Sequence, residues 1–437
     1  MYFLKNLAEL IDQHISTNLT ITTFAYDSRL VTPGALFFAL KGEKSDGHSF
    51  LKEVAAKGAA CAIVDQGYRG ETFGLVLLRV PKVLDALQMI ARKIQEKRNC
   101  RVVAVTGSVG KTTTKEFLWS LLSSKWKVAK TPGNANTQIT FPISLIHEKD
   151  DADILVAEMG MSKPGELARL VTIAPPEVAV VTNIGHAHVG YFADGKEGIA
   201  REKAQIFANP KTKIAFIHEE AMQYSAMHTG SCVKKTFGMT KGDFVLHSMG
   251  DEWKINEGPH FTLPFTEKHI CVDFLAAAVA AHGMGMSWEE IAAAAPKVKM
   301  APLRFEKIEH KGMLIINDSY NASYESMQAA LTHLPKPRLG GKTIFVFGEM
   351  PQLGSFSQEA HQSVAKLALT TVDHALLFGK SSLPMLDVFS KGNKPAEYFS
   401  DLLKLQETLL DLARPGDVIL IKGANINKMW QILDGFR

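Results

Sequence analysis

The chain has 437 residues, a length that predicts roughly three domains at about 150 residues each. With 46% hydrophobic and 22% charged residues, its composition is that of a folded globular protein and argues against extended disorder or a membrane bundle. The 49 basic and 45 acidic residues leave a net charge of only +4, which is too dilute to favour nucleic acid as a partner.

Targeting and redox features point to one compartment. The N-terminal segment lacks a basic stretch followed by an apolar core, so we expect no secretory signal. No run of about twenty apolar residues occurs, and we expect no membrane insertion. The four cysteines are widely spaced, which favours free thiols over a disulfide frame or a zinc site. These features together predict a cytoplasmic protein.

The first 82 residues are predicted to form a small α/β unit. Apolar runs at 36–40, 61–64 and 75–80 are typical of strands and lie between glycine-containing turns. From residue 83 onwards, apolar positions recur at helical spacing at Val83, Leu87, Ile90 and Ile94. This spacing predicts a helix that links the first unit to the next.

The remainder of the chain is predicted to contain two further α/β domains. Over 83–311, strand-like runs at 102–105, 154–157 and 178–181 alternate with helical patterns, as in βαβ units around a parallel sheet. Over 312–437, runs at 313–316, 343–347, 375–378 and 418–421 predict a smaller, Rossmann-like doubly wound domain. Ligands of such sheets bind at the carboxyl ends of the strands.

A glycine-rich loop lies between the strand at 102–105 and an amphipathic helix, and residues 106–114 read TGSVGKTTT. In such a loop, backbone N–H groups converge on phosphate oxygens, the lysine reaches the β- and γ-phosphates, and the next hydroxyl ligates Mg²⁺. The standard pattern needs a glycine where Val105 stands, so this is a shortened variant. The loop alone does not indicate which reaction the protein catalyses, because phosphate loops of this kind occur in enzymes of several classes. Phosphates are expected at Gly107, Ser108, Val109, Gly110, Lys111, Thr112 and Thr113.

Other polar groups follow predicted strands. Glu158 ends the strand at 154–157, where it could hold Mg²⁺ or be a solvated turn residue. His186 and His188 follow the next strand, and their pattern is equally consistent with a metal or phosphate contact and with hydrogen-bonded loop residues. Lys203 lies in a predicted helix at 198–207, where periodicity alone indicates a surface lysine.

Two strand-end loops in the last region carry further candidates. Residues 317–321 follow the strand at 313–316, and Lys422 follows the strand at 418–421. Both loops could bind a substrate carboxylate, and ordinary turn chemistry of Asn, Asp and Gly explains them equally well.

Taken together, these residues resemble the Mur ligases of peptidoglycan synthesis along the whole chain. The N-terminal marks are DSR at 27–29, PGALFFALKG at 33–42 and DGH at 46–48. The central marks are TGSVGKTTTKE at 106–116, TPGNANT at 131–137, EMG at 158–160 and the stretch 183–192. The last region contributes DSYNAS at 318–323 with Ser326 and Met327, GEM at 348–350, and His361.

The resemblance implies an ATP-dependent ligase. It implies a uridine-nucleotide domain over 1–82, an ATP domain over 83–311 and a C-terminal substrate and closure domain over 312–437. The motif at 318–327 is similar to that of members that join D-alanyl-D-alanine to UDP-N-acetylmuramoyl-tripeptide through an acyl phosphate. ATP and two Mg²⁺ ions are the implied cofactors, and we expect a monomer. The alternatives are a folylpolyglutamate synthase, disfavoured by the N-terminal domain and this motif, and a P-loop ATPase with a binding role.

The resemblance also implies roles for individual residues. It implies that Lys203 is modified by CO₂, so that a carbamate replaces the cation and offers oxygen ligands to Mg²⁺. The implied catalytic residues are Lys111, Glu158, His188 and Lys203, and the implied metal ligands are Thr112, Glu158, His188 and Lys203. Arg304 and Asp318 are expected to join the phosphate loop around ATP. The UDP-linked substrate is expected at Ser28, Arg29, Lys41, Asp46, Asn134 and Asn136, and the dipeptide at Tyr320, Asn321 and Ser326.

Three positions depart from the family pattern. Thr137 replaces the second asparagine of a pair, and Asp273 stands where the family carries an asparagine on the adenine side. Ala424 follows Lys422 and Gly423 in place of the usual serine, which removes a hydroxyl.

Overall fold

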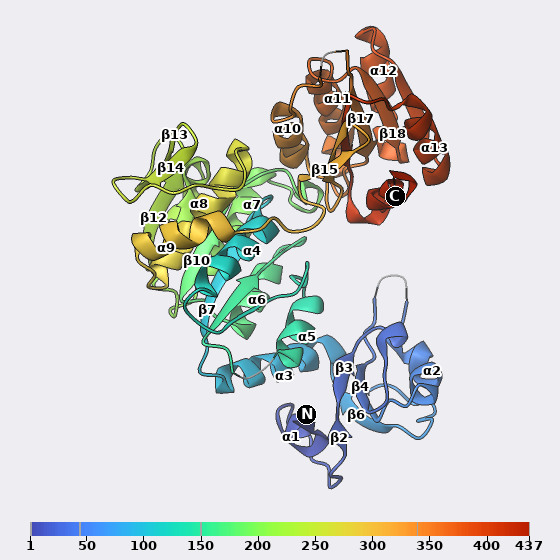
Figure 1. Ribbon diagram of the computed structural model, residues 1–437. Helices are drawn as coiled ribbons and strands as arrows, with labels where there is room; N and C mark the ends of the chain where they lie inside the picture. Colours follow the sequence, from blue (N-terminus) through green and yellow to red (C-terminus); the bar gives the residue numbers. More distant parts are fainter. Residues whose placement is uncertain (1, 43–44, 149–150, 339, 437) are drawn as a thin grey trace.

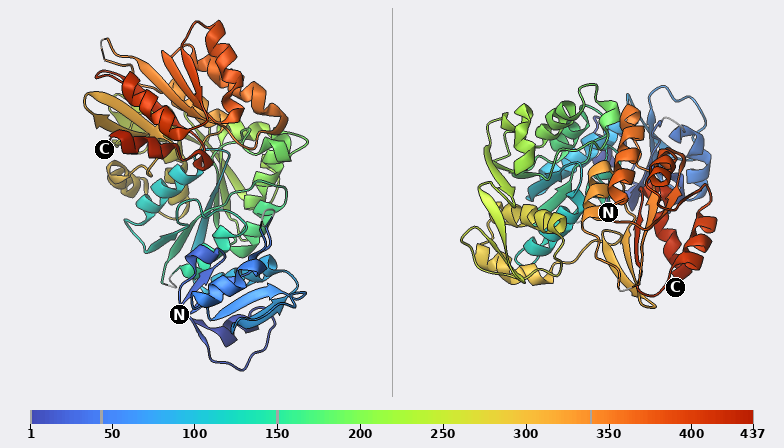
Figure 2. Two further views of the ribbon diagram at one scale, coloured as in Figure 1. Left: turned by 90° about the vertical axis from the view of Figure 1, so that its right-hand side faces the viewer. Right: turned by 90° about the horizontal axis from the view of Figure 1, so that it is seen from above.

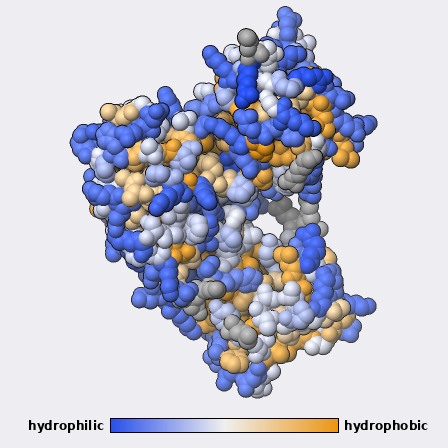
Figure 3. Space-filling view, in the orientation of Figure 1, coloured by the Kyte–Doolittle hydropathy of each residue, from blue (hydrophilic) through white to orange (hydrophobic). Residues whose placement is uncertain are grey.

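The computed structural model describes residues 2–42, 45–148, 151–338 and 340–436. These residues form three α/β regions, and the central region lies between the other two (Figures 1 and 2). The space-filling view shows a hollow on the side where the N-terminal and C-terminal regions face one another (Figure 3).

The N-terminal region is built on a four-stranded parallel sheet. Its strands are β3 (Thr23–Ala25), β4 (Ala35–Phe38), β5 (Cys61–Asp65) and β6 (Val76–Val80), in that order. Helix α2 (Leu51–Ala56) packs on one face and α3 (Val83–Lys97) on the other, because alternate residues of each strand point to opposite faces. A separate antiparallel pair, β1 (Tyr2–Phe3) and β2 (Thr20–Ile21), accompanies α1 (Leu4–Glu9). The predicted linking helix is confirmed as α3.

The central region contains an eight-stranded sheet in the order β14-β13-β12-β11-β10-β7-β9-β8, in which only β13 and β14 pair antiparallel. The three predicted strands are confirmed as β7, β9 and β10, which are neighbours in this sheet. The sequence did not predict β12 and β13, because these strands are partly exposed and lack a continuous apolar run. The bounds are β7 (Arg101–Thr106), β8 (Val128–Lys130), β9 (Ile154–Glu158), β10 (Val178–Val181), β11 (Ile214–His218), β12 (Val233–Gly238), β13 (Phe244–Met249) and β14 (Glu252–Ile255).

Helices cover both faces of the central sheet. Val103 and Val105 of β7 face α4 (Lys111–Leu122) and α8 (Lys268–Gly283), whereas Val102 and Ala104 face the side of α3, α5 (Thr140–His147) and α6 (Glu166–Ile173). Residues 275–281 and 291–294 are rich in alanine, and they lie in α8 and in α9 (Trp288–Ala294), respectively. Within the described ranges, no helix is both long enough and apolar enough to cross a membrane.

The C-terminal region holds a six-stranded sheet in the order β15-β16-β20-β17-β18-β19, parallel except for the β15–β16 pair. The four predicted strands are confirmed as β16, β17, β18 and β20. Strand β15 ends before residue 312, at which the C-terminal domain is predicted to begin, and yet it pairs with β16 of the C-terminal sheet. The functional domain boundaries stay a prediction. The strands are β15 (Glu306–His310), β16 (Met313–Asp318), β17 (Thr343–Gly348), β18 (His374–Phe378), β19 (Ala396–Phe399) and β20 (Val418–Lys422). The helices are α10 (Tyr324–Thr332), α11 (Ser357–Ala368), α12 (Pro384–Lys391) and α13 (Leu402–Leu412).

Candidate active site

A cavity of about 1160 Å³ lies between the central and C-terminal regions. Its wall combines the loop after β7 and the ends of β9 and β10 with residues that follow β16 and β20. The cavity therefore lies at the carboxyl ends of strands from two parallel sheets, where doubly wound folds bind ligands.

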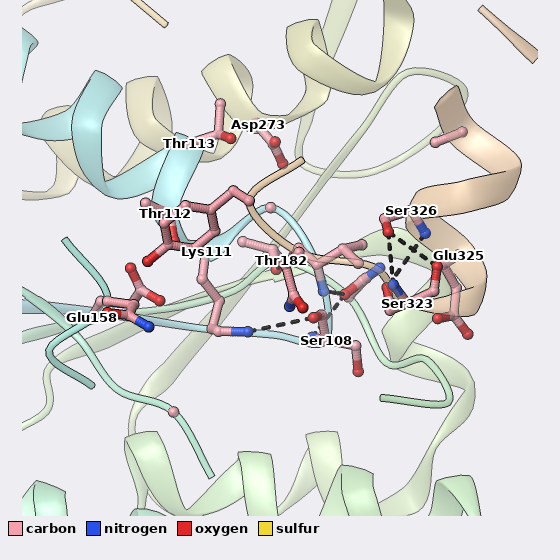
Figure 4. A pocket seen from close by; sticks show the side chains of 18 of the residues that line it. Ser108, Lys111, Thr112, Thr113, Glu158, Thr182, Asp273, Ser323, Glu325 and Ser326 are labelled. Atoms are coloured by element: carbon pink, nitrogen blue, oxygen red, sulfur yellow. Dashed lines mark hydrogen bonds between the residues drawn. The ribbon is translucent and has the colours of Figure 1, made fainter. Parts of the chain in front are cut away.

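The glycine-rich loop forms one end of the cavity. Gly110 has a φ of 83°, a left-handed conformation that side chains rarely adopt, and helix α4 begins at the next residue. Lys111 Nζ donates to the carbonyl oxygens of Gly107 at 2.8 Å and Ser108 at 3.4 Å (Figure 4). Burial lowers the pKa of Lys111, although the carboxylate of Glu158 acts in the opposite direction. All seven expected phosphate-loop residues except Gly107 line the cavity.

Arg304 reaches this loop from the junction with the C-terminal region. Its Nη2 donates to Thr112 Oγ1 at 3.1 Å, and its guanidinium carbon lies 4.0 Å from the centre of the Tyr320 ring. Arg304 Nε is buried and has no hydrogen-bond partner among the described residues. The structure thus brings together an arginine expected on the nucleotide side and a tyrosine expected on the dipeptide side, and it leaves one buried donor available to a ligand.

The two strand-end loops of the C-terminal region form a single unit. Asp318 and Lys422 are register partners on β16 and β20, and Lys422 Nζ donates to Asp318 Oδ2 at 2.5 Å. The same ammonium donates to the Asn321 carbonyl at 3.2 Å. Burial lowers the pKa of Lys422, and the neighbouring Asp318 opposes this shift. Because Lys422 is only 1% exposed, its ion pair with Asp318 holds the loop in place at the cavity wall.

Glu158 is a buried cavity residue, so its alternative as a solvated turn residue is wrong. It is 1% exposed, and its Oε1 accepts a hydrogen bond from Asn136 Nδ2 at 2.6 Å. Its Oε2 is buried and has no hydrogen-bond partner within the described chain, although Lys115 Nζ lies 3.7 Å away. A buried carboxylate oxygen without a hydrogen bond is a suitable ligand for a hard cation.

The two histidines after β10 have different environments. His188 has a φ of 67°, and its Nδ1 is buried without a hydrogen-bond partner among the described residues. Burial, and then the charges of Lys111 and Lys203, lower the pKa of His188 to about 4, so its imidazole is neutral at pH 7 and has a lone pair for a metal. His186 is a hydrogen-bonded loop residue, because its Nδ1 lies 2.7 Å from Glu325 Oε1.

Lys203, at the end of α7 (Lys196–Lys203), is only 2% exposed, so the surface position expected from periodicity is wrong. Burial, and then the neighbouring charge of Lys111, lower the pKa of Lys203 well below its usual value. Lys203 is not one of the residues that line the cavity. In the described ranges, no group of three or more His, Cys, Asp or Glu side chains is placed to hold a metal.

The residues expected to bind the UDP-linked substrate fall into two places. Asn134 and Asn136 line the cavity, as do the residues expected to bind the dipeptide, Tyr320, Asn321 and Ser326. The other four, Ser28, Arg29, Lys41 and Asp46, lie in the N-terminal region, outside the cavity wall.

In the N-terminal region, two side chains of this set, those of Arg29 and Asp46, are held by local contacts. The Arg29 side chain is 83% exposed and pairs with Asp27 at 2.5 Å. Asp46 Oδ1 accepts from the backbone N–H of His48 at 3.0 Å and lies 2.6 Å from His48 Nδ1. These contacts fix the turns that carry the two charged residues.

Several site residues were missed by the sequence analysis. Lys115 is fully buried and donates to backbone carbonyls of the loop at 131–137. The sequence signal for its burial was its position on the apolar face of α4, which it shares with Leu118 and Leu122. Asn183 Oδ1 accepts from two N–H groups of the phosphate loop. Glu325 had no local signal, because its partner His186 lies 139 positions away in another region.

The three positions that depart from the family pattern have different environments. Asp273 lines the cavity beside Gly110, where a Cβ would lie 2.1 Å from Asp273 Oδ1. Burial raises the pKa of Asp273 to about 7, although the charge of Arg304 acts against this shift. Thr137 Oγ1 lies 2.9 Å from Thr140 Oγ1 at the start of α5, and Ala424 lines the cavity.

Comparison with known proteins identifies the class to which this fold and site belong. The family model "Mur ligase family, catalytic domain" matches residues 20–95, "Mur ligase middle domain" matches 105–281, and "Mur ligase, glutamate ligase domain" matches 303–425. The chain belongs to the Mur ligase family, as the sequence motifs indicated.

Individual relatives are similar along nearly the whole chain. The UDP-N-acetylmuramoyl-tripeptide--D-alanyl-D-alanine ligase of Bacillus subtilis (strain 168) is 31% identical, and the match covers 98% of this chain and 97% of the relative. The crystal structure of MurF from Acinetobacter baumannii has a TM-score of 0.86 at 28% identity and covers 100% and 98% of the two chains. MurF ligase from Thermotoga maritima in complex with ADP has a TM-score of 0.79 at 29% identity, with 96% and 98% covered. These matches confirm the predicted three-region α/β fold.

Proposed function

We propose that this protein is an ATP-dependent amide ligase that adds D-alanyl-D-alanine to UDP-N-acetylmuramoyl-tripeptide, giving the UDP-linked pentapeptide, ADP and phosphate in peptidoglycan synthesis. The observation that carries this proposal is the cavity, which is lined both by the phosphate loop and by residues of the motif at 318–327. The Bacillus subtilis relative, matched over nearly its full length, is named for this reaction. A P-loop ATPase with a binding role would give that motif no purpose.

The reaction needs activation because joining a carboxylate to an amine is uphill in water. In the proposed course, the terminal carboxylate of the tripeptide attacks the γ-phosphorus of ATP and forms an acyl phosphate, and ADP leaves. Lys111 turns from the loop carbonyls toward the transferring phosphoryl group, where its ammonium and the N–H groups of the loop stabilise negative charge. Arg304, held over Tyr320, supplies a second cation beside the nucleotide.

Two Mg²⁺ ions are part of the proposed reaction, and three groups at the cavity wall are chemically suited to hold Mg²⁺. Glu158 Oε2 and His188 Nδ1 are both buried without a hydrogen-bond partner in the described chain, and the Thr112 hydroxyl lies at the start of α4. Lys203 fits carbamylation, because an amine with a lowered pKa is neutral more often and can attack CO₂. Bound Mg²⁺ would neutralise charge on the phosphate oxygens.

The second half of the reaction belongs to the C-terminal region. The amine of the dipeptide attacks the acyl carbon, loses a proton, and the C–O bond to phosphate breaks. Tyr320, Asn321 and Ser326 line the cavity where the dipeptide is proposed to bind, and Asp318 is proposed to face ATP. Closure of this region over the cavity excludes water, which would otherwise hydrolyse the acyl phosphate.

The three regions then have separate tasks. Residues 1–82 bind the uridine nucleotide through Ser28, Arg29, Lys41 and Asp46, residues 83–311 carry the ATP chemistry, and residues 312–437 capture the dipeptide. The proposed use of ATP by this protein supports the cytoplasmic location that the sequence predicts. The monomeric state stays a prediction.

The test supplies purified protein with ATP, Mg²⁺ and UDP-N-acetylmuramoyl-tripeptide, with and without D-alanyl-D-alanine. Sustained phosphate release should require the dipeptide, and the product should have the mass of the UDP-linked pentapeptide. Phosphate release at the same rate without the dipeptide would instead support an ATPase and refute the ligase.

A further inference from the structure

One segment of the central region contacts both the phosphate loop and the C-terminal region. It comprises residues 182–188, follows β10 and ends at His188. Asn183 Oδ1 accepts hydrogen bonds from the backbone N–H groups of Ser108 and Val109, each at 2.9 Å. The N–H of Gly185 donates to Ser108 Oγ at 2.8 Å. The segment is therefore fixed to the loop that is proposed to bind the nucleotide phosphates.

The other side of this segment is held by a carboxylate from the C-terminal region. Glu325 lies in the first turn of α10, and its Oε1 accepts from both the backbone N–H and Nδ1 of His186, each at 2.7 Å. Because a carboxylate only accepts, His186 Nδ1 carries the proton of this bond. The carboxylate rests on Gly185, where a Cβ would lie 2.5 Å from Glu325 Cδ.

Ring packing reinforces this contact. The His186 ring stacks on Phe356 with centroids 4.4 Å apart and meets the edge of Tyr324 at 5.3 Å. Close by, the backbones of Gly190 and Gly354 approach so nearly that a Cβ on Gly190 would lie 2.9 Å from the Gly354 nitrogen. His186 and Gly190 of the central region thus pack directly on residues of the C-terminal region.

Glu325 is also connected to the dipeptide side of the cavity. The helix α10 on which it lies begins with a capping box, in which the N–H of Ser323 donates to Ser326 Oγ at 3.0 Å. Burial raises the pKa of Glu325, but its hydrogen bonds with His186 outweigh this and hold it below the usual value. Glu325 therefore stays an acceptor at neutral pH, one residue from Ser326.

We infer that His186 and Glu325 form a clasp that positions the C-terminal region on the nucleotide site for amide formation. The inference rests on the proposed ligase function. Both are positioning residues that act through Ser326 on one side and through Asn183 and His188 on the other.

The clasp matters because two nucleophiles compete for the acyl phosphate. In the productive course, the dipeptide nitrogen bonds to the acyl carbon, a proton leaves the nitrogen, and the C–O bond to phosphate breaks. In the unproductive course, a water oxygen takes the place of the nitrogen, and the tripeptide carboxylate is regenerated with loss of phosphate. A seated C-terminal region favours the amine by placing the dipeptide and excluding water.

The test compares Glu325→Ala and His186→Phe with the wild type by the number of phosphates released per pentapeptide formed. The wild-type ratio should be close to one. In Glu325→Ala we expect this ratio to rise about threefold or more and the KM for the dipeptide to rise about tenfold, while the KM for ATP changes less than about twofold. His186→Phe keeps the ring stack but removes the Nδ1 donor, so its effect should be smaller and in the same direction.

A matched control is Asp387→Asn, which removes an exposed pair with Lys391 on α12 of the same region. This variant should keep the wild-type ratio. The double variant that combines Glu325→Ala with His186→Phe should have nearly the same ratio as Glu325→Ala alone, because the two side chains act as one unit. A ratio near one in Glu325→Ala, with the fold intact by circular dichroism, would overturn the clasp.

A second readout separates the clasp from the proposed function. If the wild type forms no pentapeptide, the ligase proposal fails. Small-angle X-ray scattering then tests separately whether the His186–Glu325 clasp holds the C-terminal region against the central region. A larger radius of gyration for Glu325→Ala than for the wild type and Asp387→Asn would support it, and identical scattering from all three would overturn it.

Discussion

Lys115 ties the helix of the phosphate loop to the rest of the site, and its removal should have a large effect. Its side chain is fully buried, and Nζ donates to the carbonyl oxygens of Thr131 at 3.0 Å and Gly133 at 2.7 Å. The same ammonium lies 3.2 Å from Glu116 Oε1 and 3.7 Å from Glu158 Oε2. One cation thus serves two backbone carbonyls and two carboxylates.

The substitution Lys115→Met keeps most of the side-chain volume and removes the charge and its donors. A hydrogen bond to a charged group contributes about 1.5–3 kcal/mol, and breaking a buried ion pair costs about 3–5 kcal/mol. These contributions share one ammonium and are not additive. We therefore expect the unfolding free energy of the central region to fall by about 4 kcal/mol.

Urea unfolding followed by tryptophan fluorescence measures this change, because Trp119 lies on α4 and donates to the Val128 carbonyl at 3.1 Å. The control is Lys213→Met, whose lysine is 74% exposed and pairs with Glu177 at 2.9 Å. A surface pair contributes about 0–1 kcal/mol, so this control should unfold near the wild-type midpoint. The reasoning would be refuted if both variants unfolded at the same urea concentration.

Three further substitutions test the site. Lys111→Met should lower the rate of phosphate release by about 10²–10³-fold, because a cation at the transferring phosphoryl group is lost; a loss below tenfold would remove Lys111 from this role. Lys203→Ala should lower the rate of pentapeptide formation by about 10²-fold or more, and added short carboxylic acids, which replace the carbamate oxygens, should restore part of that rate. Absence of rescue with ADP binding intact would count against carbamylation. Burial raises the folded pKa of Asp273 from 3.8 to about 7, so the native state binds more protons between these values and stability falls as pH rises through this window. Asp273→Asn should lack that loss, so its Tm advantage should grow from pH 5 to pH 8, whereas parallel Tm profiles would contradict the burial of a carboxyl.

The parts of the fold that the sequence could predict are those encoded by continuous local patterns. Strands β7, β9 and β10 are buried on both faces and read as apolar runs, as parallel strands do. Strand β12 begins with the exposed Val233 and two lysines, so nothing in its sequence distinguishes it from a surface loop. Its place at the sheet is set by pairing with β11, which a local pattern does not record.

The candidate site divides in the same way. The phosphate loop is contiguous and was predictable, and Glu158 and His188 were found because they follow strands. Periodicity placed Lys203 at the surface, because the groups that bury it come from other elements. The His186–Glu325 contact joins two regions of the chain, and no local signal could have predicted it.

In the proposed reaction, this protein converts a tripeptide carboxylate into an acyl phosphate, and the acyl group is then transferred to an amine. The most direct measurement uses UDP-N-acetylmuramoyl-tripeptide labelled with ¹⁸O in its terminal carboxylate, with ATP, Mg²⁺ and D-alanyl-D-alanine. If the carboxylate attacks the γ-phosphorus, mass spectrometry should find one ¹⁸O in each inorganic phosphate, together with one UDP-linked pentapeptide per phosphate. Phosphate that carries no label, or that forms without pentapeptide, would contradict the account.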